Sequence, residues 1–218
     1  MAAANVLQRG SVGYNTRLPR PHVRLRQPEA NRPSENTNSR AAPQPAAVHT
    51  KPAMSHPLQL PFRDAMSVCA GGVHVITTDG SAGRYGITMT AVAPVTDEPP
   101  TIMLCINKQA GIVPVLLQNR ALCINVLSAH QQDVAEHFAG LTALSPEERF
   151  AYHIWHKGRQ GQLQVEGALA HLHGTIAECN EVGTHRVFMA EISEIAVRPH
   201  SADTPALVYF RRHFAALG

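Results

Sequence analysis

The chain has 218 residues, of which 44% are hydrophobic and 16% are charged, and its formal net charge is +3. This length suits one domain with a sizeable core, with or without a tail. No stretch approaches the ~18 consecutive apolar residues that a membrane-spanning helix needs. We therefore expect no association with a membrane.

The charge divides the chain near residue 53. Residues 1–53 hold eight basic and two acidic residues, a balance of +6, which leaves 11 basic and 14 acidic residues, or −3, in the remainder. They also hold seven of the 16 prolines, so we expect a disordered basic extension rich in Pro, Arg and Ala. Three interpretations stay open for it: a transit peptide, a nucleic-acid-binding arm, or a stretch before a natural start at Met54. Residues 54–218 are then the folded domain, and their acidic balance argues against nucleic-acid binding.

The four cysteines predict free thiols. Cys69, Cys105, Cys123 and Cys179 lie far apart, form no C-x-x-C pair and stand mostly in apolar runs. This pattern favours buried thiols in a reducing compartment over a disulfide framework or a zinc site. The expected location is the cytoplasm.

Short helices and apolar strands alternate through the domain. Apolar residues spaced i, i+3, i+4 and i+7 predict an amphipathic helix over 62–70, which two glycines end. Branched residues on both sides of a turn at 79–83 predict a β-hairpin. In chain order we expect helix 62–70, strands 73–78, 85–92 and 101–106, helix 111–118, strand 121–127, helices over 129–138 and from 145, and strands 168–182, 186–197 and 206–210. Many strands with short inserted helices predict a mainly β fold, either a barrel or a sandwich.

The common catalytic motifs do not occur in the sequence. It has no G-x-G-x-x-G, P-loop, G-x-S-x-G or H-E-x-x-H. His171 and His173 alternate on one strand face, but no carboxylate or thiol stands at a spacing that completes a tetrahedral set. We therefore predict no metal site and interpret the two histidines as part of a solvated strand face.

The segment 84–91 has residue types suited to ligand binding. Gly86 precedes two alternating hydroxyl residues, Thr88 and Thr90. A glycine allows close backbone approach, and hydroxyl and N–H donors suit a phosphate or a flat heterocycle. Threonine is also an ordinary strand residue, so both interpretations stay open on these residues alone.

Several segments together resemble a known family. They are 62–66 (Phe-Arg-Asp-Ala-Met), 86–91 (Gly-Ile-Thr-Met-Thr-Ala), 95–101, 105–107, 123–127 and 183–185 (Gly-Thr-His). With them, the chain from Phe62 to Phe214 resembles the short-chain flavin reductases that serve two-component monooxygenases. Segments 137–140, 147–150, 155–158 and 208–214 are most similar to the reductases of aromatic-ring hydroxylases. The reductases of pyrimidine utilisation are the alternative.

The resemblance implies a fold, cofactors and partners. The fold would be a flavin-binding split β-barrel, with short inserted helices, in a homodimer. The cofactor would be FMN or FAD, with NADH, or else NADPH, as the hydride donor. Hydride passes from nicotinamide C4 to flavin N5, which requires the two rings to be positioned rather than a general base. The partner would be a separate oxygenase that receives diffusible reduced flavin.

The family motifs also imply site residues. Flavin contacts fall at Tyr85, Gly86, Ile87, Thr88, Thr90, Ala91, Cys105, Ile106, Asn107, Gly111, Ile112, His137 and Phe138. Nicotinamide contacts fall at His185, Tyr209 and Arg211. We predict no catalytic residue, although His185 is a candidate for polarising or positioning the nicotinamide. Gly111 and Ile112 depart from the family pattern, because many relatives have Arg or Ser there.

Two other classes of function compete with a reductase. The first is a flavin-carrying or flavin-sensing protein without efficient NADH turnover, which the intact Gly-Thr-His segment argues against. The second is a protein that binds nucleic acid or a protein partner through its basic extension.

Overall fold

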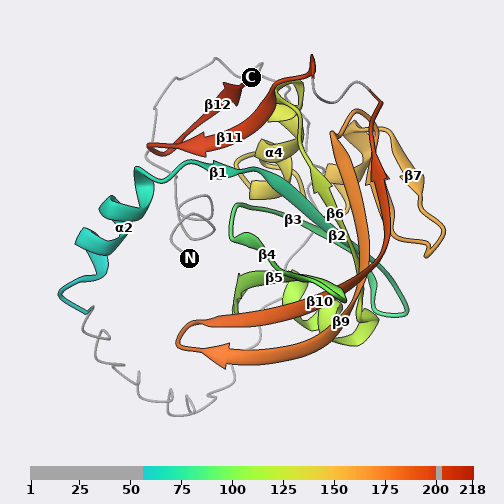
Figure 1. Cartoon of the computed structure of the whole chain (residues 1–218), viewed down its shortest axis with the longest axis horizontal. Helices are drawn as coiled ribbons and strands as arrows, with labels where there is room; N and C mark the ends of the chain where they lie inside the picture. Colours follow the sequence, from blue (N-terminus) through green and yellow to red (C-terminus); the bar gives the residue numbers. More distant parts are fainter. Residues whose placement is uncertain (1–55, 200–202) are drawn as a thin grey trace, which may run out of the picture. The chain divides into compact units, whose positions relative to one another are not determined.

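Strands dominate residues 56–199 and 203–218, which a computed structural model describes (Figure 1). The largest sheet is antiparallel with the strand order β3-β2-β6-β9-β10-β5-β4. Its strands are β2 (His74–Gly80), β3 (Gly83–Met89), β4 (Val92–Asp97), β5 (Pro100–Asn107), β6 (Ala121–Val126), β9 (Ala170–Val182) and β10 (His185–Val197). Figure 1 shows the long β9–β10 hairpin curving past the other strands.

Two small sheets and five short helices complete the described part. The three-stranded sheet holds β1 (Gly71–Gly72), β11 (Ala206–Phe210) and β12 (His213–Leu217), and the two-stranded sheet holds β7 (Trp155–Lys157) and β8 (Leu163–Val165). The helices are α2 (Gln59–Ser67), α3 (Ile112–Asn119), α4 (Gln132–Ala139) and the 3-10 helices η1 (Ala129–Gln131) and η2 (Glu148–Tyr152). The mainly β architecture with short inserted helices is therefore confirmed, whereas the predicted extension over residues 1–53 lies outside the described residues.

Both faces of the large sheet are buried at β2 and β6, which explains the continuous apolar runs of these strands. In β2, Ile76 packs with Leu116 of α3 in one cluster, whereas Val75 packs with Phe138 of α4 in another. Successive side chains of a strand point to opposite faces, so each face meets a different helix. The sheet thus holds α3 and α4 on its two sides.

Five strands were missed by the sequence patterns. The missed strands are β1, β4, β7, β8 and β12. β4 contains Pro94 and four exposed residues, and β12 has the sequence HFAAL without a β-branched residue. Neither pattern is typical of a strand, and both form by pairing with a neighbour, β5 or β11.

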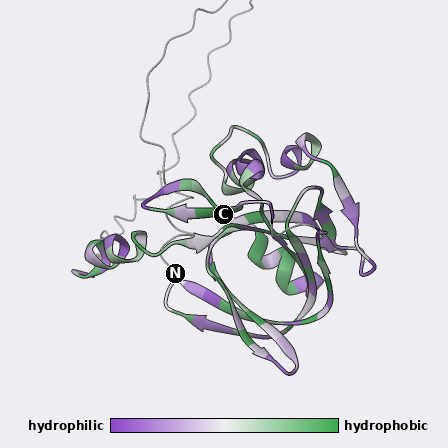
Figure 2. Ribbon diagram, turned by 45° about the horizontal axis from the view of Figure 1, so that its top comes forward, coloured by the Kyte–Doolittle hydropathy of each residue, from purple (hydrophilic) through white to green (hydrophobic). Residues whose placement is uncertain are grey.

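The predicted amphipathic helix forms, but its apolar face is not covered. None of the residues of α2 is buried, and Phe62 is 51% exposed. Figure 2 shows α2 at the left edge, with apolar and polar residues. The two glycines after it pair with β11 as β1. Cys69 is correspondingly exposed and Cys179 half-buried, so the prediction of buried thiols holds only for Cys105 and Cys123.

The interpretation of His171 and His173 as a solvated strand face is wrong. His173 has no exposed surface, and its Nε2 lies 2.7 Å from the side-chain amide of Gln164 in β8. His171 Nδ1 lies 2.9 Å from Oδ1 of Asn125. The segment that contains β7 and β8 covers this face. Gly158 of that segment lies so close to the His173 ring that a Cβ there would overlap it.

Candidate functional site

Three of the predicted flavin segments meet at one cavity of about 310 Å³. Its lining residues come from β3, from the loop before α3, from the end of α4 and from η2, and we call it the β3–α4 pocket. They are Tyr85, Gly86, Ile87, Gln109, Ala110, Gly111, Phe138, Ala139, Gly140 and Arg149. The volume lies at the lower end of the range for small-molecule sites, roughly 300–1,000 Å³.

Two of the three glycines that line the pocket make room for aromatic side chains. A Cβ at Gly86 would lie 2.6 Å from ring atoms of Phe138, and a Cβ at Gly111 would overlap the Tyr85 hydroxyl. Phe138 is buried against Phe150, with ring centroids 4.9 Å apart. The space beside Gly86 is therefore filled by the Phe138 ring, whereas the sequence suggested that this glycine makes room for a ligand.

Thr88 anchors α4 to the sheet. Its hydroxyl donates to the carbonyl of Ala135 over 2.7 Å, and the residue is 2% exposed. This hydroxyl therefore has a structural partner that the sequence analysis did not foresee. Thr90 is half-buried at the end of the same strand, and Ala91 follows it with its carbonyl accepting from the Cys105 N–H over 3.1 Å.

A second group of predicted residues lies together on β5 and β10. Asn107 is the register partner of His185, and Cys105 is the partner of Val187. Ile106 and Ile112 instead belong to the apolar core, and neither lines the β3–α4 pocket. The Asn107 side chain accepts from the Gln109 N–H over 2.9 Å, which shapes the turn before α3.

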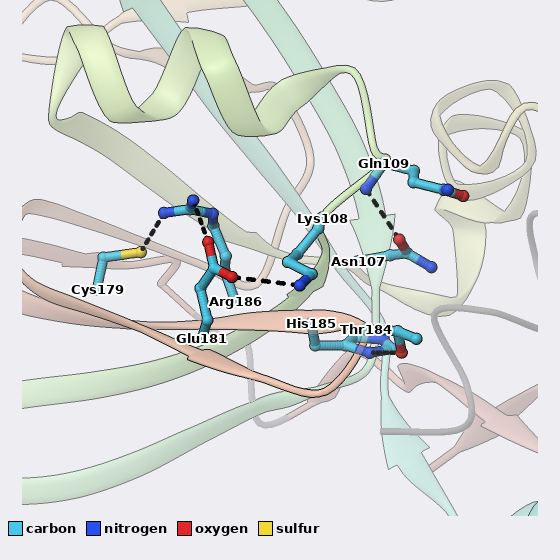
Figure 3. A network of polar contacts seen from close by, with 8 residues as sticks. All are labelled: Asn107, Lys108, Gln109, Cys179, Glu181, Thr184, His185 and Arg186. Carbon is cyan, nitrogen blue, oxygen red and sulfur yellow. Dashed lines mark hydrogen bonds and ion pairs between the residues drawn. The ribbon is translucent and has the colours of Figure 1, made fainter.

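His185 is buried with one ring nitrogen lacking a partner. The residue is 8% exposed, and its Nδ1 lies 2.9 Å from the Thr184 hydroxyl (Figure 3). Among the described residues, its Nε2 has no hydrogen-bond partner. Burial lowers the pKa of His185, so the ring is neutral at pH 7. An unpartnered buried polar atom costs about 1–3 kcal/mol, which a ligand that supplies the partner would recover.

Three charged side chains form a network near the β9–β10 turn that precedes this histidine. Lys108 Nζ lies 3.2 Å from Glu181 Oε2, and Arg186 contacts the other oxygen of the same carboxylate (Figure 3). The Lys108 N–H also donates to the carbonyl of Thr184 over 3.0 Å. These contacts hold the turn between β9 and β10 against the end of β5.

The structure does not bring all predicted residues together. Tyr209 and Arg211 belong to the region of the three-stranded sheet, whereas His185 begins a strand of the seven-stranded sheet. Tyr209 packs on Phe214 with centroids 5.2 Å apart, and Arg211 is exposed at a left-handed turn position (φ 48°). In the described part of the chain, no hydrogen bond or ion pair joins either residue to His185.

His137 lies beside the β3–α4 pocket but does not line it. Its Nδ1 is 2.7 Å from Nε2 of His153, and its ring lies 5.4 Å from that of Tyr152. Five residues that line the pocket were not among the predicted flavin contacts: Gln109, Ala110, Ala139, Gly140 and Arg149. Arg149 stood within a segment that carried the family resemblance, but its pattern indicated only the start of a helix.

Two classes of feature are absent from residues 56–199 and 203–218. No helix there combines the length and apolarity that crossing a membrane requires. The same residues contain no group of three or more His, Cys, Asp or Glu side chains arranged to hold a metal ion.

Comparison with known proteins assigns the chain to a family. The flavin reductase like domain matches residues 66–218. The reductase component of 4-hydroxyphenylacetate 3-monooxygenase from Pseudomonas aeruginosa is 48% identical over 161 residues, which cover 74% of this chain and 93% of that protein. The FMN reductase (NADH) RutF of Pseudomonas syringae pv. syringae is 42% identical and covers 72% of this chain and 85% of its own length. Among solved structures, the Streptomyces globisporus NADH:FAD oxidoreductase SgcE6 in complex with NAD and FAD fragments is 26% identical, with a TM-score of 0.66 over 73% of this chain and 92% of that one. Together with the mainly β fold and the convergence of the motif segments on one pocket, these matches show that the chain belongs to the flavin reductase family.

Proposed function

We propose that the protein is an NAD(P)H-dependent flavin reductase that supplies reduced flavin to the separate oxygenase of a two-component monooxygenase. The flavin, FMN or FAD, would accept a hydride at N5 from the nicotinamide. The observation that carries the proposal is the β3–α4 pocket, where three segments that resemble the family's flavin-binding motifs come together. The four free cysteines fit a cytoplasmic location.

The residues of the pocket fit a flavin nucleotide. Ile87 and Phe138 offer apolar surface, whereas the Tyr85 hydroxyl and Arg149 offer polar contacts. None of the lining residues is acidic, so an anionic ligand meets no like charge there. His185 would contribute from the neighbouring group, where its unpartnered Nε2 suits the carboxamide of a nicotinamide.

The activity is tested with the full chain by following NADH oxidation at 340 nm with and without FMN or FAD. We expect oxidation that depends on added flavin, and the relative rates rank the two flavins and the two nicotinamide nucleotides. A folded protein that binds flavin but does not oxidise NADH or NADPH would contradict the proposal and favour the flavin-carrier alternative.

His185→Ala should raise KM for NADH about 10-fold while changing the flavin Kd less than about twofold. A lost hydrogen bond of about 1–1.5 kcal/mol corresponds to this factor. Steady-state kinetics and a flavin titration measure the two quantities. His185→Gln keeps a donor and an acceptor, so it should restore part of the affinity for NADH. An unchanged KM in the alanine variant would refute the nicotinamide assignment.

We further propose an oxygenase of the 4-hydroxyphenylacetate 3-monooxygenase type as the partner. The 48% identity to the reductase component of that system supports it. Adding the protein, FMN or FAD and NADH to such an oxygenase should yield hydroxylated 4-hydroxyphenylacetate. Flavin reduction without hydroxylation, combined with turnover by a pyrimidine-utilisation oxygenase, would favour the alternative.

We also propose a homodimer in which a second copy covers α2. Nine-residue helices are marginal in water on their own, and α2 leaves Leu60 and Phe62 67% and 51% exposed. Its contacts to the β11–β12 turn are polar: Arg212 pairs with Asp64, and the Arg211 N–H donates to the Ser67 carbonyl. The apolar face of α2 thus remains available to a partner.

Phe62→Asp should shift the protein from dimer to monomer, because it places a charge in the proposed apolar interface. Analytical ultracentrifugation over a range of protein concentrations measures the change. Gln59→Asp, which adds the same charge to the same helix, serves as the control and should leave the dimer intact. A monomeric wild-type protein would contradict the proposal.

A further inference from the structure

Arg149 is the charged residue among those that line the β3–α4 pocket. Its Nε donates to the carbonyl of Leu144 over 3.3 Å, which fixes the side chain. Its Nη2 lies near the end of α4, where a Cβ at Gly140 would be 3.5 Å away. The guanidinium is therefore held at the pocket wall by a neutral backbone group.

The nearby carboxylates are occupied by other partners. Glu147 pairs with Arg84, and Glu148 accepts from the backbone N–H of Ser145 over 2.8 Å. Among the described residues, Arg149 has no ion-pair partner. A guanidinium that is half-buried, fixed and without a counter-charge can bind an oxyanion through two parallel hydrogen bonds.

A second part of the pocket lining lies at the start of α3. Gln109, Ala110 and Gly111 lead directly into its first turn, where the Val113 N–H already donates to the Ala110 carbonyl over 3.0 Å. The first N–H groups of a helix lack acceptors within the helix and carry partial positive charge. The Tyr85 hydroxyl, next to Gly111, adds a further donor to that part of the lining.

We propose that Arg149 binds the phosphate of the flavin nucleotide and thereby sets a preference for FMN or FAD over riboflavin. The inference rests on the proposed function, because that function supplies the phosphorylated ligand.

The test compares FMN with riboflavin, which share the ring and the ribityl chain and differ in the phosphate. In the full chain, Arg149→Ala should raise the Kd for FMN about 10–100-fold, the factor for a lost hydrogen bond to a charged group. The Kd for riboflavin should change less than about twofold. Arg149→Lys should restore part of the affinity for FMN. Fluorescence titration measures all of these constants.

Arg198→Ala is the matched control. Arg198 is an exposed arginine that donates to the Gly167 carbonyl over 3.2 Å, and it does not line the pocket. Its removal should leave the ratio of the FMN and riboflavin constants unchanged.

Three results would overturn the inference. Equal loss of affinity for both flavins in Arg149→Ala would indicate a structural role. A raised KM for NADH with an unchanged Kd for FMN would assign Arg149 to the nicotinamide nucleotide. Wild-type protein that binds FMN no more tightly than riboflavin would remove the phosphate contact altogether. Tight, Arg149-dependent binding of FMN without NADH oxidation would contradict the proposed function alone.

Discussion

Gly86→Ala should lower the free energy of unfolding by about 2–3 kcal/mol, the cost of overpacking a rigid core site. The new methyl carbon would lie 2.6 Å from two atoms of the Phe138 ring. That ring cannot move aside easily, because Phe150 and Trp155 pack against it with centroids 4.9 and 5.4 Å away. Urea unfolding followed by circular dichroism measures the loss. Flavin affinity should fall with it, because Phe138 lines the pocket.

A double variant separates this clash from other effects of the methyl group. Phe138→Leu alone removes ring contacts and should destabilise the protein. In combination with Gly86→Ala, it opens the space that the methyl group needs. The double variant should therefore lose less free energy of unfolding than the sum of the losses in the two single variants. Strict additivity would contradict the proposed contact between the two side chains.

The second large effect is a loss of folding stability as the pH falls below about 6.5. Burial, with smaller contributions from His173 and His156, lowers the pKa of His171 from 6.5 to about 4. Between about pH 6.5 and 4, the His171 ring is therefore protonated in the unfolded chain but neutral in the folded protein. The stability contributed by the neutral ring is present above pH 6.5 and is lost as the pH falls through this window. We expect a loss of roughly 1–2 kcal/mol from His171, because the partly exposed ring keeps some screening by water.

Other buried histidines act in the same direction. Burial lowers the pKa of His74, His153, His173 and His185 as well. Urea unfolding at several pH values between 6.5 and 4 should therefore show a steep loss of stability in the wild type. His171→Gln should show a smaller slope over the same range. Identical slopes in the two proteins would contradict the shifted pKa of His171.

Carboxylates contribute in a different window. Hydrogen bonds from Ser145 lower the pKa of Glu148, and Lys108 lowers that of Glu181. Their contributions are present above the ordinary carboxylate pKa and are lost at lower pH. The histidine effect is thus measurable separately between about pH 6.5 and 5, before these groups titrate.

The sequence patterns predicted the strands that carry branched, buried residues. The β2–β3 hairpin and the long strands β9 and β10 follow the predicted ranges closely. β4 and β12 could not be predicted in this way, since pairing with β5 and β11 decides their conformation. The burial of His173 depends on contacts with the separate β7–β8 segment, so periodicity within β9 could not indicate it.

The candidate site was predictable in its segments but not in its contacts. Motif resemblance located Tyr85, Gly111 and Phe138, which the structure brings to one pocket. It could not show that the Thr88 hydroxyl bonds to α4, because that bond depends on how the helix docks. Nor could it show that Arg149 faces the pocket, since a short 3-10 helix has no apolar period long enough to indicate its orientation.

The register of the large sheet sets the order in which the pocket can form during folding. The hairpins β2–β3, β4–β5 and β9–β10 join neighbours in the sequence, whereas β2–β6, β6–β9 and β5–β10 join segments that are far apart. Non-local pairings must overcome the entropy of closing long loops, so they form late and slowly. The walls of the pocket come from β3, the start of α3, α4 and η2, which meet only after these late pairings. A full-length but partly folded chain would thus contain every segment that lines the pocket and still lack the pocket itself.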